Sequence, residues 1–449
     1  MIGKEAIMNR PIGIDLFAGA GGMSLGFEQA GFDVVAAVEI DPVHCAVHKY
    51  NFPNCTVIPR SVVGLTGSEI RVAAGLGRRQ VDIVFGGAPC QGFSMIGQRA
   101  LDDPRNALVR DFLRLVSELD ATSFVFENVK GLTQGQHRKF LDEFVGMAES
   151  LGYNVRSPWK VLNAADYGVP QSRERLFLLG SKKGVTIADY PSPSTLRARV
   201  QSVGLPDIAA GPTVEDALAD LPDADKYEIL RVSDEVRVSR FGKASSYAQE
   251  LRCLTNDAWH FGYVREWDSG LLTSSARTDH SDISRRRFSA TVGGSTEPIS
   301  RFFKLDANGI SNTLRAGTDG ARGAFTSPRP IHYKYDRCVT VREMARLHGY
   351  PDWFRFNETK WHGARQIGNS VPPPLARAVA GQVLKALNIV PSQPEGSISL
   401  GATDLLRMTV SEASRHFGIV APVMRRDRKS GAKKRKQIDI EQERTLAYG

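Results

Sequence analysis

The sequence lacks the features that mark secreted, membrane-spanning and zinc-binding proteins. Only five of its 449 residues are cysteines, and they form no CxxC pair and no Cys/His cluster at zinc spacing. No apolar run reaches the length of about eighteen residues that a membrane span needs. The first residues show no basic stretch followed by an apolar segment and a cleavage site. We therefore expect a cytoplasmic protein with reduced thiols, no membrane anchor and no metal site.

The sequence also has fewer acidic than basic residues, but most of the excess positive charge lies in one segment. The chain has 58 Lys and Arg against 49 Asp and Glu, a net charge of +9. Residues 424–437 hold eight Lys or Arg and one Asp, so this segment contributes +7 and the rest of the chain +2 (9 − 7). Such a tail either adds sequence-independent affinity for DNA or only keeps the chain soluble. The charge alone therefore does not identify a nucleic-acid enzyme.

The first part of the chain alternates between strand-like and helix-like segments. Short runs rich in Val, Ile, Leu and Phe, typical of strands buried on both faces, lie at 12–17, 34–38, 81–85, 124–126 and 176–179. Between them, apolar residues recur every three or four positions at 108–119 and 140–148, which predicts amphipathic helices. This alternation predicts an α/β fold with a doubly wound, mostly parallel sheet.

The order changes after residue 184. Residues 185–330 are rich in Ser, Thr, Arg, Gly and Pro, and only 214–221 has a helical pattern. An amphipathic helix at 375–387 then returns to the α/β style, a linker follows at 391–397, and a short helix is expected at 410–417. We predict a catalytic and cofactor-binding domain at 1–184 and a smaller, loop-rich, β-containing domain at 185–361. A return to the first domain at 362–390 and a C-terminal extension at 391–449 complete the division.

Two features at the ends of the first two predicted strands indicate a nucleoside-binding site. Glycines between Asp15 and Gly22 let the backbone turn tightly and approach a ligand. Glu39 ends the second strand, where a carboxylate can accept hydrogen bonds from ribose hydroxyls. The alternative is a glycine turn beside a surface glutamate, but ligands of open α/β sheets bind at this edge. A dinucleotide site would want glycine at position 24, where Ser24 stands, so an adenosyl ligand is favoured.

A thiol, a carboxyl group and two arginines follow the later predicted strands. Cys90 lies in 86–94, whose Pro, Gln, Gly and Ser residues are typical of an exposed loop, although most isolated cysteines are inert core residues. Glu127 is either a solvated strand end or a half-buried carboxyl group with a raised pKa. Arg173 and Arg175 share one face of an extended segment and either stabilise an anion or meet solvent.

The segments that carry these residues resemble, in order, the motifs of the cytosine-5 DNA methyltransferase family of bacterial restriction–modification systems. The similarity covers 12–180 and 311–385 and consists of DLFAGAGG, VEIDP, GGAPCQGFS, ENVKGL, QSRERLFLLG, TVREMARLHGYPDWF and QIGNSVPPPLA. It implies an S-adenosylmethionine-dependent, Rossmann-like catalytic domain with a smaller target-recognition domain. The implied activity is methylation of carbon-5 of cytosine in double-stranded DNA.

The resemblance assigns the chemistry to four residues. Cys90 would attack carbon-6 of a flipped cytosine, so that carbon-5 can take the methyl group. Glu127 would hold ring nitrogen 3, and Arg173 and Arg175 would brace the carbonyl oxygen of the base and the catalytic loop. A free thiol titrates near ~8.5, so Cys90 needs a cationic or dipolar neighbour, for which the arginines are candidates.

The resemblance also implies the cofactor S-adenosyl-L-methionine. Phe17 would stack on adenine, Ile40 would cover its other face and Glu39 would hold the ribose. The full expected set is Phe17, Gly19, Ala20, Gly22, Glu39, Ile40, Ser61, Pro89, Leu108, Asn369 and Ser370. Ser61 stands where the family usually has an aspartate for the adenine amino group, so either its hydroxyl or another residue such as Asp82 makes that contact.

Region 185–330 occupies the target-recognition position of the family. The target base must leave the helical stack before it can be methylated, and the protein must hold the remaining duplex. The cations expected on phosphates or guanine edges lie around Arg286, although each could equally be a solvated surface charge. The expected substrate-binding residues are Gln91, Ser94, Arg277, His280, Arg285 and Arg287.

Three other classes of protein stay open. An RNA (tRNA) cytosine-5 methyltransferase with the same core is disfavoured by the long region 185–330. A catalytically inactive DNA-binding relative is disfavoured by the intact Cys90, Gln91, Glu127 and Arg173. A dinucleotide-dependent oxidoreductase gives Pro89, Cys90 and Gln91 no role. We expect a prokaryotic monomer that acts at the nucleoid, with a cognate restriction endonuclease as a separate protein.

Overall fold

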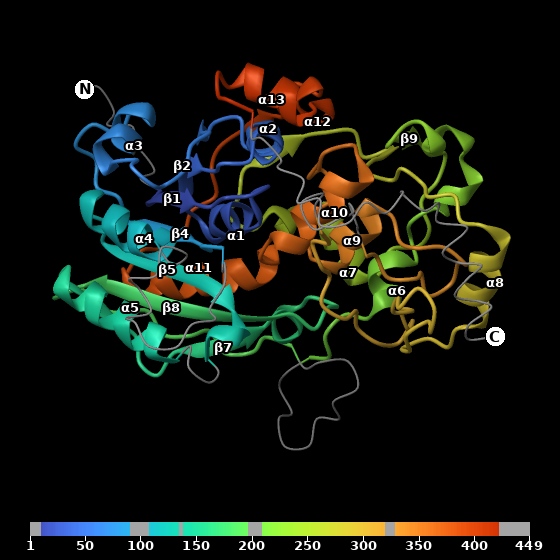
Figure 1. Ribbon diagram of the computed structural model, residues 1–449, viewed down its shortest axis with the longest axis horizontal. Coiled ribbons are helices and arrows are strands. Elements are labelled where there is room, and N and C mark those ends of the chain that lie inside the picture. Colours follow the sequence, from blue (N-terminus) through green and yellow to red (C-terminus); the bar gives the residue numbers. More distant parts are fainter. Residues whose placement is uncertain (1–9, 90–106, 134–137, 196–208, 319–327, 422–449) are drawn as a thin grey trace, which may run out of the picture.

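The computed structural model describes residues 10–89, 107–133, 138–195, 209–318 and 328–421. Its main element (Figure 1) is an eight-stranded sheet in the order β3-β2-β1-β4-β5-β8-β6, with β7 paired to β8. The parallel strands are β1 (Ile12–Leu16), β2 (Asp33–Val38), β3 (Thr56–Ile58), β4 (Ile83–Gly86) and β5 (Ser123–Val129). The antiparallel strands are β8 (Glu174–Lys182), β6 (Tyr153–Val155) and β7 (Lys160–Asn163). The predicted doubly wound, mostly parallel α/β fold is confirmed.

Helices cover both faces of the sheet because successive strand residues point to opposite faces. Val84 and Phe126 pack on the face covered by α3 (Gly67–Ala73), α4 (Ala107–Glu118) and α5 (Arg138–Ser150). Phe85 and Val125, their neighbours along the strands, pack on the face covered by α1 (Gly22–Ala30) and α11 (Pro373–Ala386). The central strands therefore carry apolar residues on both faces, as the sequence runs predicted, while β5 also carries the polar Glu127 and Asn128 near its end.

Helix α11, predicted at 375–387, packs closely on α1. A Cβ added to Gly26 would lie 2.5 Å from the Cβ of Ala376 and 2.6 Å from the carbonyl oxygen of Pro373. Only glycine permits this approach, so the first and last helices of the three-layer core are in direct contact. Ala188 and Tyr190 pack on the same core, and the domain boundaries remain a prediction.

The loop-rich part, residues 209–318 and 328–358, contains more helix than the sequence predicted. Within 185–330, where the sequence predicted only α6 (Val214–Leu218), it has α7 (Ser246–Leu251) and α8 (Asp282–Ala290). Helix α9 (Val341–Leu347) follows, and β9 (Val236–Arg237) and β11 (Leu271–Leu272) are two residues each. The expectation of a single helix was wrong because α7 and α8 are short and begin at the capping side chains of Ser245 and Ser281.

Buried ion pairs connect separate segments of this loop-rich part. Arg346, with no exposed side-chain surface, binds Asp352 at 2.6 Å and Asp220 at 3.1 Å. Arg337 binds Glu343 at 2.8 Å, with 1% and 4% of the two side chains exposed. Breaking either pair would leave a buried charge without its partner, so the pairs hold these segments in one arrangement.

The described part of the C-terminal extension packs on the body of the protein. Strand β12 (Ser397–Ser399) pairs with β10 (Val264–Glu266), and α12 (Asp404–Arg407) and α13 (Val410–His416) lie on α2 (Pro42–Asn51). Helix α13 matches the helix expected at 410–417. The segment predicted as a linker also makes contacts, since the carbonyl oxygen of Ser392 accepts a 2.6 Å hydrogen bond from Arg10. Among the described residues, no helix has the length and apolar character required to cross a membrane.

Candidate active site

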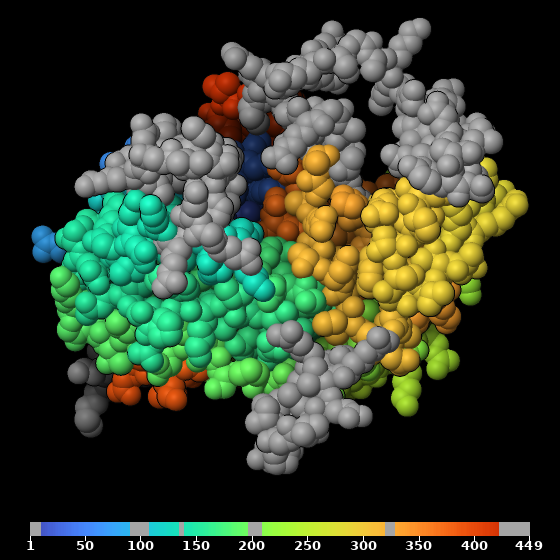
Figure 2. Space-filling model, turned by 60° about the horizontal axis from the view of Figure 1, so that its bottom comes forward, coloured from blue at the N-terminus to red at the C-terminus, as the bar shows by residue number. Residues whose placement is uncertain are grey.

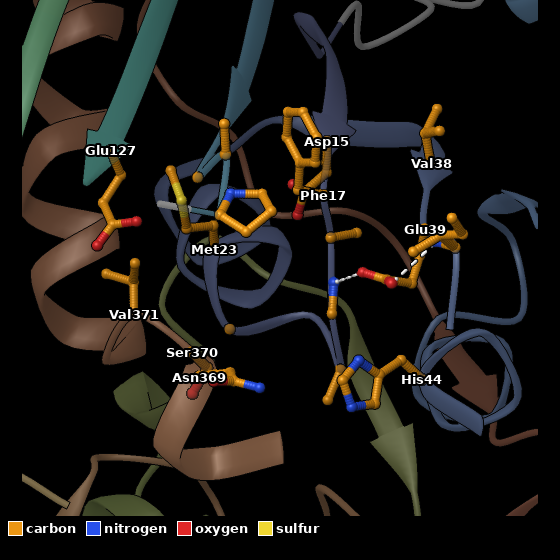
Figure 3. Close-up of a pocket in the computed structure, with 18 of the residues that line it drawn as sticks. Asp15, Phe17, Met23, Val38, Glu39, His44, Glu127, Asn369, Ser370 and Val371 are labelled. Carbon is orange, nitrogen blue, oxygen red and sulfur yellow. Dashed lines mark hydrogen bonds between the residues drawn. The ribbon is translucent and has the colours of Figure 1, made fainter. Parts of the chain in front are cut away.

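A cavity of about 580 Å³ opens at the carboxyl ends of the central parallel strands. Such edges are the usual ligand sites of open α/β sheets. In Figure 3, Glu127 enters the cavity from one side, and Glu39 and His44 lie on the other. All of the expected cofactor residues line it: Phe17, Gly19, Ala20, Gly22, Glu39, Ile40, Ser61, Pro89, Leu108, Asn369 and Ser370.

The glycine loop after β1 has a backbone that few residues other than glycine adopt. Gly21 has a φ of 101°, and a Cβ there would lie 2.4 Å from the ring of Phe52. Phe17 is in the left-handed region with a φ of 64°, which is strained for a residue with a large side chain. The fold maintains this strain at the wall of the cavity, as is common at ligand sites.

Glu39 is held in place by backbone donors. Its carboxylate accepts hydrogen bonds from the amide nitrogens of Gly19 at 2.8 Å, Ile40 at 2.9 Å and Asp41 at 2.8 Å. These bonds tie the end of β2 to the glycine loop and fix the carboxylate on the cavity wall (Figure 3). Each carboxylate oxygen can accept more than one hydrogen bond, so Glu39 can still receive a ligand hydroxyl.

A buried polar chain behind the glycine loop was not predicted from the sequence. The hydroxyl of Ser24 donates to Asp15 at 2.6 Å and lies 3.0 Å from Nε2 of His48. Burial raises the pKa of Asp15 to about 8 and lowers that of His48 to about 3. Asp15 lines the cavity, so the serine that stands in the dinucleotide-glycine position instead anchors an acidic group of the wall.

Glu127, at the end of β5, and Arg175, in β8, meet at the opposite side of the cavity. Nε of Arg175 lies 2.9 Å from Oε1 of Glu127, with 14% and 12% of the side chains exposed. Burial raises the pKa of Glu127, and the nearby Arg175 and Arg173 oppose this rise. A Cβ on Gly87 would lie 2.4 Å from Oε2 of Glu127, so glycine is required there for the carboxyl group to keep its position.

Arg173 lies beneath the cavity rather than in its wall. Its fully buried guanidinium donates to the carbonyl oxygens of Leu314 at 2.9 Å, Gly368 at 2.8 Å and Ser370 at 2.8 Å. Gln171 supports the same region, because its amide oxygen accepts from the nitrogen of Leu314 at 3.1 Å. These contacts give Arg173 a structural role that the sequence did not predict.

A model of one protein family matches residues 12–385, namely the C-5 cytosine-specific DNA methylase family. The chain belongs to this family. It is a methyltransferase that acts on carbon-5 of cytosine in DNA.

Individual relatives agree with this membership. The Type II methyltransferase M.XorII of Xanthomonas oryzae pv. oryzae is 55% identical over 93% of this chain and 95% of its own length. The Type II methyltransferase M1.HphI of Haemophilus parahaemolyticus is 33% identical over 83% and 86%. A solved structure described as a candidate DNA modification methyltransferase of an E. coli prophage has a TM-score of 0.66 and 32% identity, covering 84% of this chain and 99% of its own.

Three expected residues of the methyltransferase, Cys90, Gln91 and Ser94, lie outside the described residues. The described chain reaches position 89, and Gly87, Ala88 and Pro89 line the cavity next to Glu127. The amide of Asn128 donates to the carbonyl oxygen of Ala88 at 3.0 Å. The strand that carries Glu127 therefore also orients the segment that leads to Cys90.

The expected DNA-reading cations are engaged within the loop-rich part. Arg277 is 7% exposed and lies 3.3 Å from Glu228 and 3.2 Å from Asp279. Arg285 contacts Asp225 and Asp336, both at 2.8 Å, and Arg287 lies 3.6 Å from Glu297. Nε2 of His280 accepts from the amide of Cys338 at 3.2 Å. These contacts favour structural roles for these side chains, and their binding to DNA remains a prediction.

Two further results concern the residues expected around the cofactor. Asp82, considered as a substitute for the missing aspartate, does not line the cavity. It accepts a 2.7 Å hydrogen bond from the amide of Ile12, at the ends of β1 and β4 where these strands begin. Its substitution for Ser61 is therefore wrong. Arg365, which the sequence did not single out, does line the cavity and stacks on Trp361 at 5.3 Å.

Proposed function

We propose that the methyltransferase uses S-adenosylmethionine to methylate a cytosine that has been flipped out of double-stranded DNA, with Cys90 as the covalent nucleophile. One observation carries this proposal. A single cavity is lined by the whole expected cofactor set, by Glu127 and Arg175, and by the described residues immediately before Cys90. The two ends of the cavity differ in chemistry: Glu39 can accept hydrogen bonds from a nucleoside, and Glu127 can hold a proton.

The chemistry of the wall fits S-adenosylmethionine, which supplies an electrophilic methyl group on a sulfonium centre. The half-buried ring of Phe17 and the exposed Ile40 offer apolar surface for adenine, and Glu39 can accept from ribose hydroxyls. The cavity also contains a cation for the carboxylate of the donor. Arg175 pairs with Glu127 and Arg60 with Glu69, whereas Arg365 pairs with no carboxylate among the described residues.

The proposed reaction uses the opposite end of the cavity. The thiolate of Cys90 forms a bond to carbon-6, and the displaced electrons of the ring are accommodated by proton sharing between Glu127 and nitrogen 3. Carbon-5 then takes the methyl group with its own electron pair, the bond between that methyl group and the sulfonium sulfur breaks, and S-adenosylhomocysteine is the leaving group. Loss of the carbon-5 proton to a base or to water returns the electron pair that expels the Cys90 thiolate. Arg175 orients Glu127 throughout, because their 2.9 Å contact fixes the carboxyl group.

The other thiols that the structure describes are poor candidates for this nucleophile. Burial raises the pKa of Cys45, Cys55, Cys253 and Cys338, so each disfavours the reactive thiolate. None of the four lines the cavity. This supports Cys90 as the nucleophile.

A groove beside the cavity is suitable for a duplex. Figure 2 shows a hollow between the teal and green surface of the catalytic layers and the orange and yellow surface of the loop-rich part. Exposed Arg286 on α8 and Arg315 near Gly368 are cations for phosphates. We propose that the duplex lies in this hollow with the target base turned toward Glu127.

The biological setting is part of the proposal. The Type II names of M.XorII and M1.HphI support a role in a restriction–modification system, with a separate endonuclease that cuts unmethylated DNA. We further propose that the enzyme acts as a monomer in the cytoplasm.

The decisive experiment measures transfer of a labelled methyl group to duplex DNA and, separately, to transfer RNA. We expect transfer to DNA, a covalent adduct with DNA containing 5-fluorocytosine, and neither with Cys90→Ala. Transfer to RNA alone, or full activity of Cys90→Ala, would overturn the proposal. Bisulfite sequencing of DNA from expressing cells then identifies the methylated site.

A further inference from the structure

Residues 397–417, here called the C-terminal brace, lie beyond the family match, which ends at residue 385. They contact one wall of the cavity through α2. Leu406 is fully buried in a cluster with Ala46, Val47 and Tyr50 of α2 and with Ala20 of the glycine loop. The amide of Gly401 donates to the carbonyl oxygen of Tyr50 at 2.9 Å. Because Ala20 and His44 line the cavity, the brace supports that wall from behind.

The brace also contacts the segment that leads into α10 (Lys360–Asn369), which forms the other wall. The amide of Glu358 donates to the carbonyl oxygen of Leu406 at 3.0 Å, and the side chain of Asn357 donates to that of Met408 at 3.3 Å. Arg407 pairs with Glu358 at 2.8 Å. Helix α10 then carries Arg365 and Asn369 to the cavity.

The two walls also meet directly at this end. Phe52, which follows α2, packs on Phe354 with ring centroids 5.9 Å apart, in one buried cluster with Ala18. Asn51, at the end of α2, exchanges two hydrogen bonds with the backbone of Arg355, at 2.9 and 3.0 Å. The brace adds backbone hydrogen bonds and a buried apolar cluster to this connection. Figure 1 shows α12 and α13 seated beside α2.

We propose that the C-terminal brace positions the two walls of the methyl-donor pocket and that Leu406 is its main positioning residue. This inference rests on the proposed S-adenosylmethionine site. A brace that holds the walls at their binding separation lowers the cost of ordering them when the donor binds. Loss of the brace therefore weakens donor binding and leaves kcat at saturating donor unchanged.

The test is Leu406→Ala in the full chain, with calorimetry of S-adenosylhomocysteine and steady-state kinetics. We expect the Kd of this product and the KM of the donor to rise about tenfold, within the usual range of coupling between sites. The kcat at saturating donor and the KM for DNA stay within about twofold of the original values. Leu406→Met, which fills a similar volume, restores donor affinity.

A matched control separates positioning from general loss of stability. Leu141 is also a fully buried leucine, but it lies in α5 on the far face of the sheet. Leu141→Ala should lower the melting temperature without changing donor affinity. The inference is overturned if Leu406→Ala binds the donor as tightly as the original chain does. It is also overturned if Leu406→Ala and Leu141→Ala lose donor affinity and DNA affinity to the same extent.

A second variant covers the case in which Leu406→Ala does not fold. A Cβ on Gly401 would lie 2.8 Å from the Cα of Tyr50, so Gly401→Val must push the brace away from α2. We expect the same selective loss of donor affinity, and its absence refutes the brace. If the original chain binds no S-adenosylhomocysteine, the proposed function itself fails, which is a distinct result.

Discussion

Replacing Arg173 with methionine should detach the segment that closes the cavity. The guanidinium is fully buried and donates to three carbonyl oxygens, those of Leu314, Gly368 and Ser370. These carbonyls belong to two segments that are distant in sequence from β8. Methionine fills much of the same space but donates no hydrogen bond, so the three acceptors lose their partner.

The expected destabilisation follows from these contacts. Hydrogen bonds to a charged group contribute about 1.5–3 kcal/mol each, so three give roughly 4.5–9 kcal/mol before any offset. Burial opposes this, because desolvation of the guanidinium lowers the pKa of Arg173 well below its ordinary value. The change removes the charge itself and leaves three neutral carbonyl oxygens without this donor, each at a cost of about 1–3 kcal/mol. We expect a total loss of roughly 3 kcal/mol, the lower end of these three costs.

The assay is urea denaturation of Arg173→Met, with Arg175→Met as the matched control. Arg175 pairs with Glu127 at the cavity, with 14% of its side chain exposed. Its replacement should cost little stability and most of kcat. Arg173→Met should instead lower stability and donor affinity together. If Arg173→Met is as stable as the original chain and loses only kcat, then Arg173 acts on the base and this reasoning is wrong.

Three further predictions concern the cavity. Glu39→Gln should weaken S-adenosylhomocysteine about tenfold in calorimetry, because a neutral amide accepts ribose hydrogen bonds less strongly than a carboxylate; unchanged affinity would remove Glu39 from the site. Arg365→Ala should weaken the binding of S-adenosylmethionine by a similar factor of about ten, but not the binding of its decarboxylated analogue, which lacks the carboxylate. Equal losses of affinity for both ligands would contradict a contact between Arg365 and the carboxylate. Burial raises the pKa of Glu127, so its protonated fraction declines only as pH rises through that raised value; kcat/KM should decrease on this alkaline side, and Glu127→Gln should abolish the decrease while lowering kcat about a hundredfold. An alkaline decrease that persists in Glu127→Gln would assign it to another group.

Strands β1, β2, β4, β5 and β8 could be predicted from the sequence because each contains a short apolar run. Strands β3, β6 and β7 were not predicted, since they are short and only partly buried. The antiparallel direction of β8 could not be predicted either, since an apolar run has the same pattern in either direction. Helices α7 and α8 also escaped prediction. Their positions depend on the capping hydroxyls of Ser245 and Ser281, whereas the sequence argument searched for apolar periodicity.

The cavity wall was predictable where the backbone itself limits the choice of residue. Gly21 and Gly87 stand where a Cβ would collide with Phe52 and with Glu127, so these positions carry a readable signal. Asp82 and Arg277 carry no such signal. A sequence does not distinguish a charged side chain that binds a ligand from one that binds another part of the protein. Here Asp82 accepts from the amide of Ile12, and Arg277 pairs with Glu228.

The contacts of Arg173 and Ser370 show that the cavity, the proposed donor pocket, depends on segments from distant parts of the chain. A Cβ on Gly22 would lie 2.5 Å from the carbonyl oxygen of Val371, so the glycine loop is in van der Waals contact with the returning segment. That segment is fixed by Arg173 from one side and, through α10, by the C-terminal brace from the other. The cavity therefore forms only when two segments separated by more than three hundred residues, those of Gly22 and Val371, are in contact. Donor binding and closure of the fold are consequently one linked equilibrium, because a ligand that binds only the closed arrangement stabilises it by mass action.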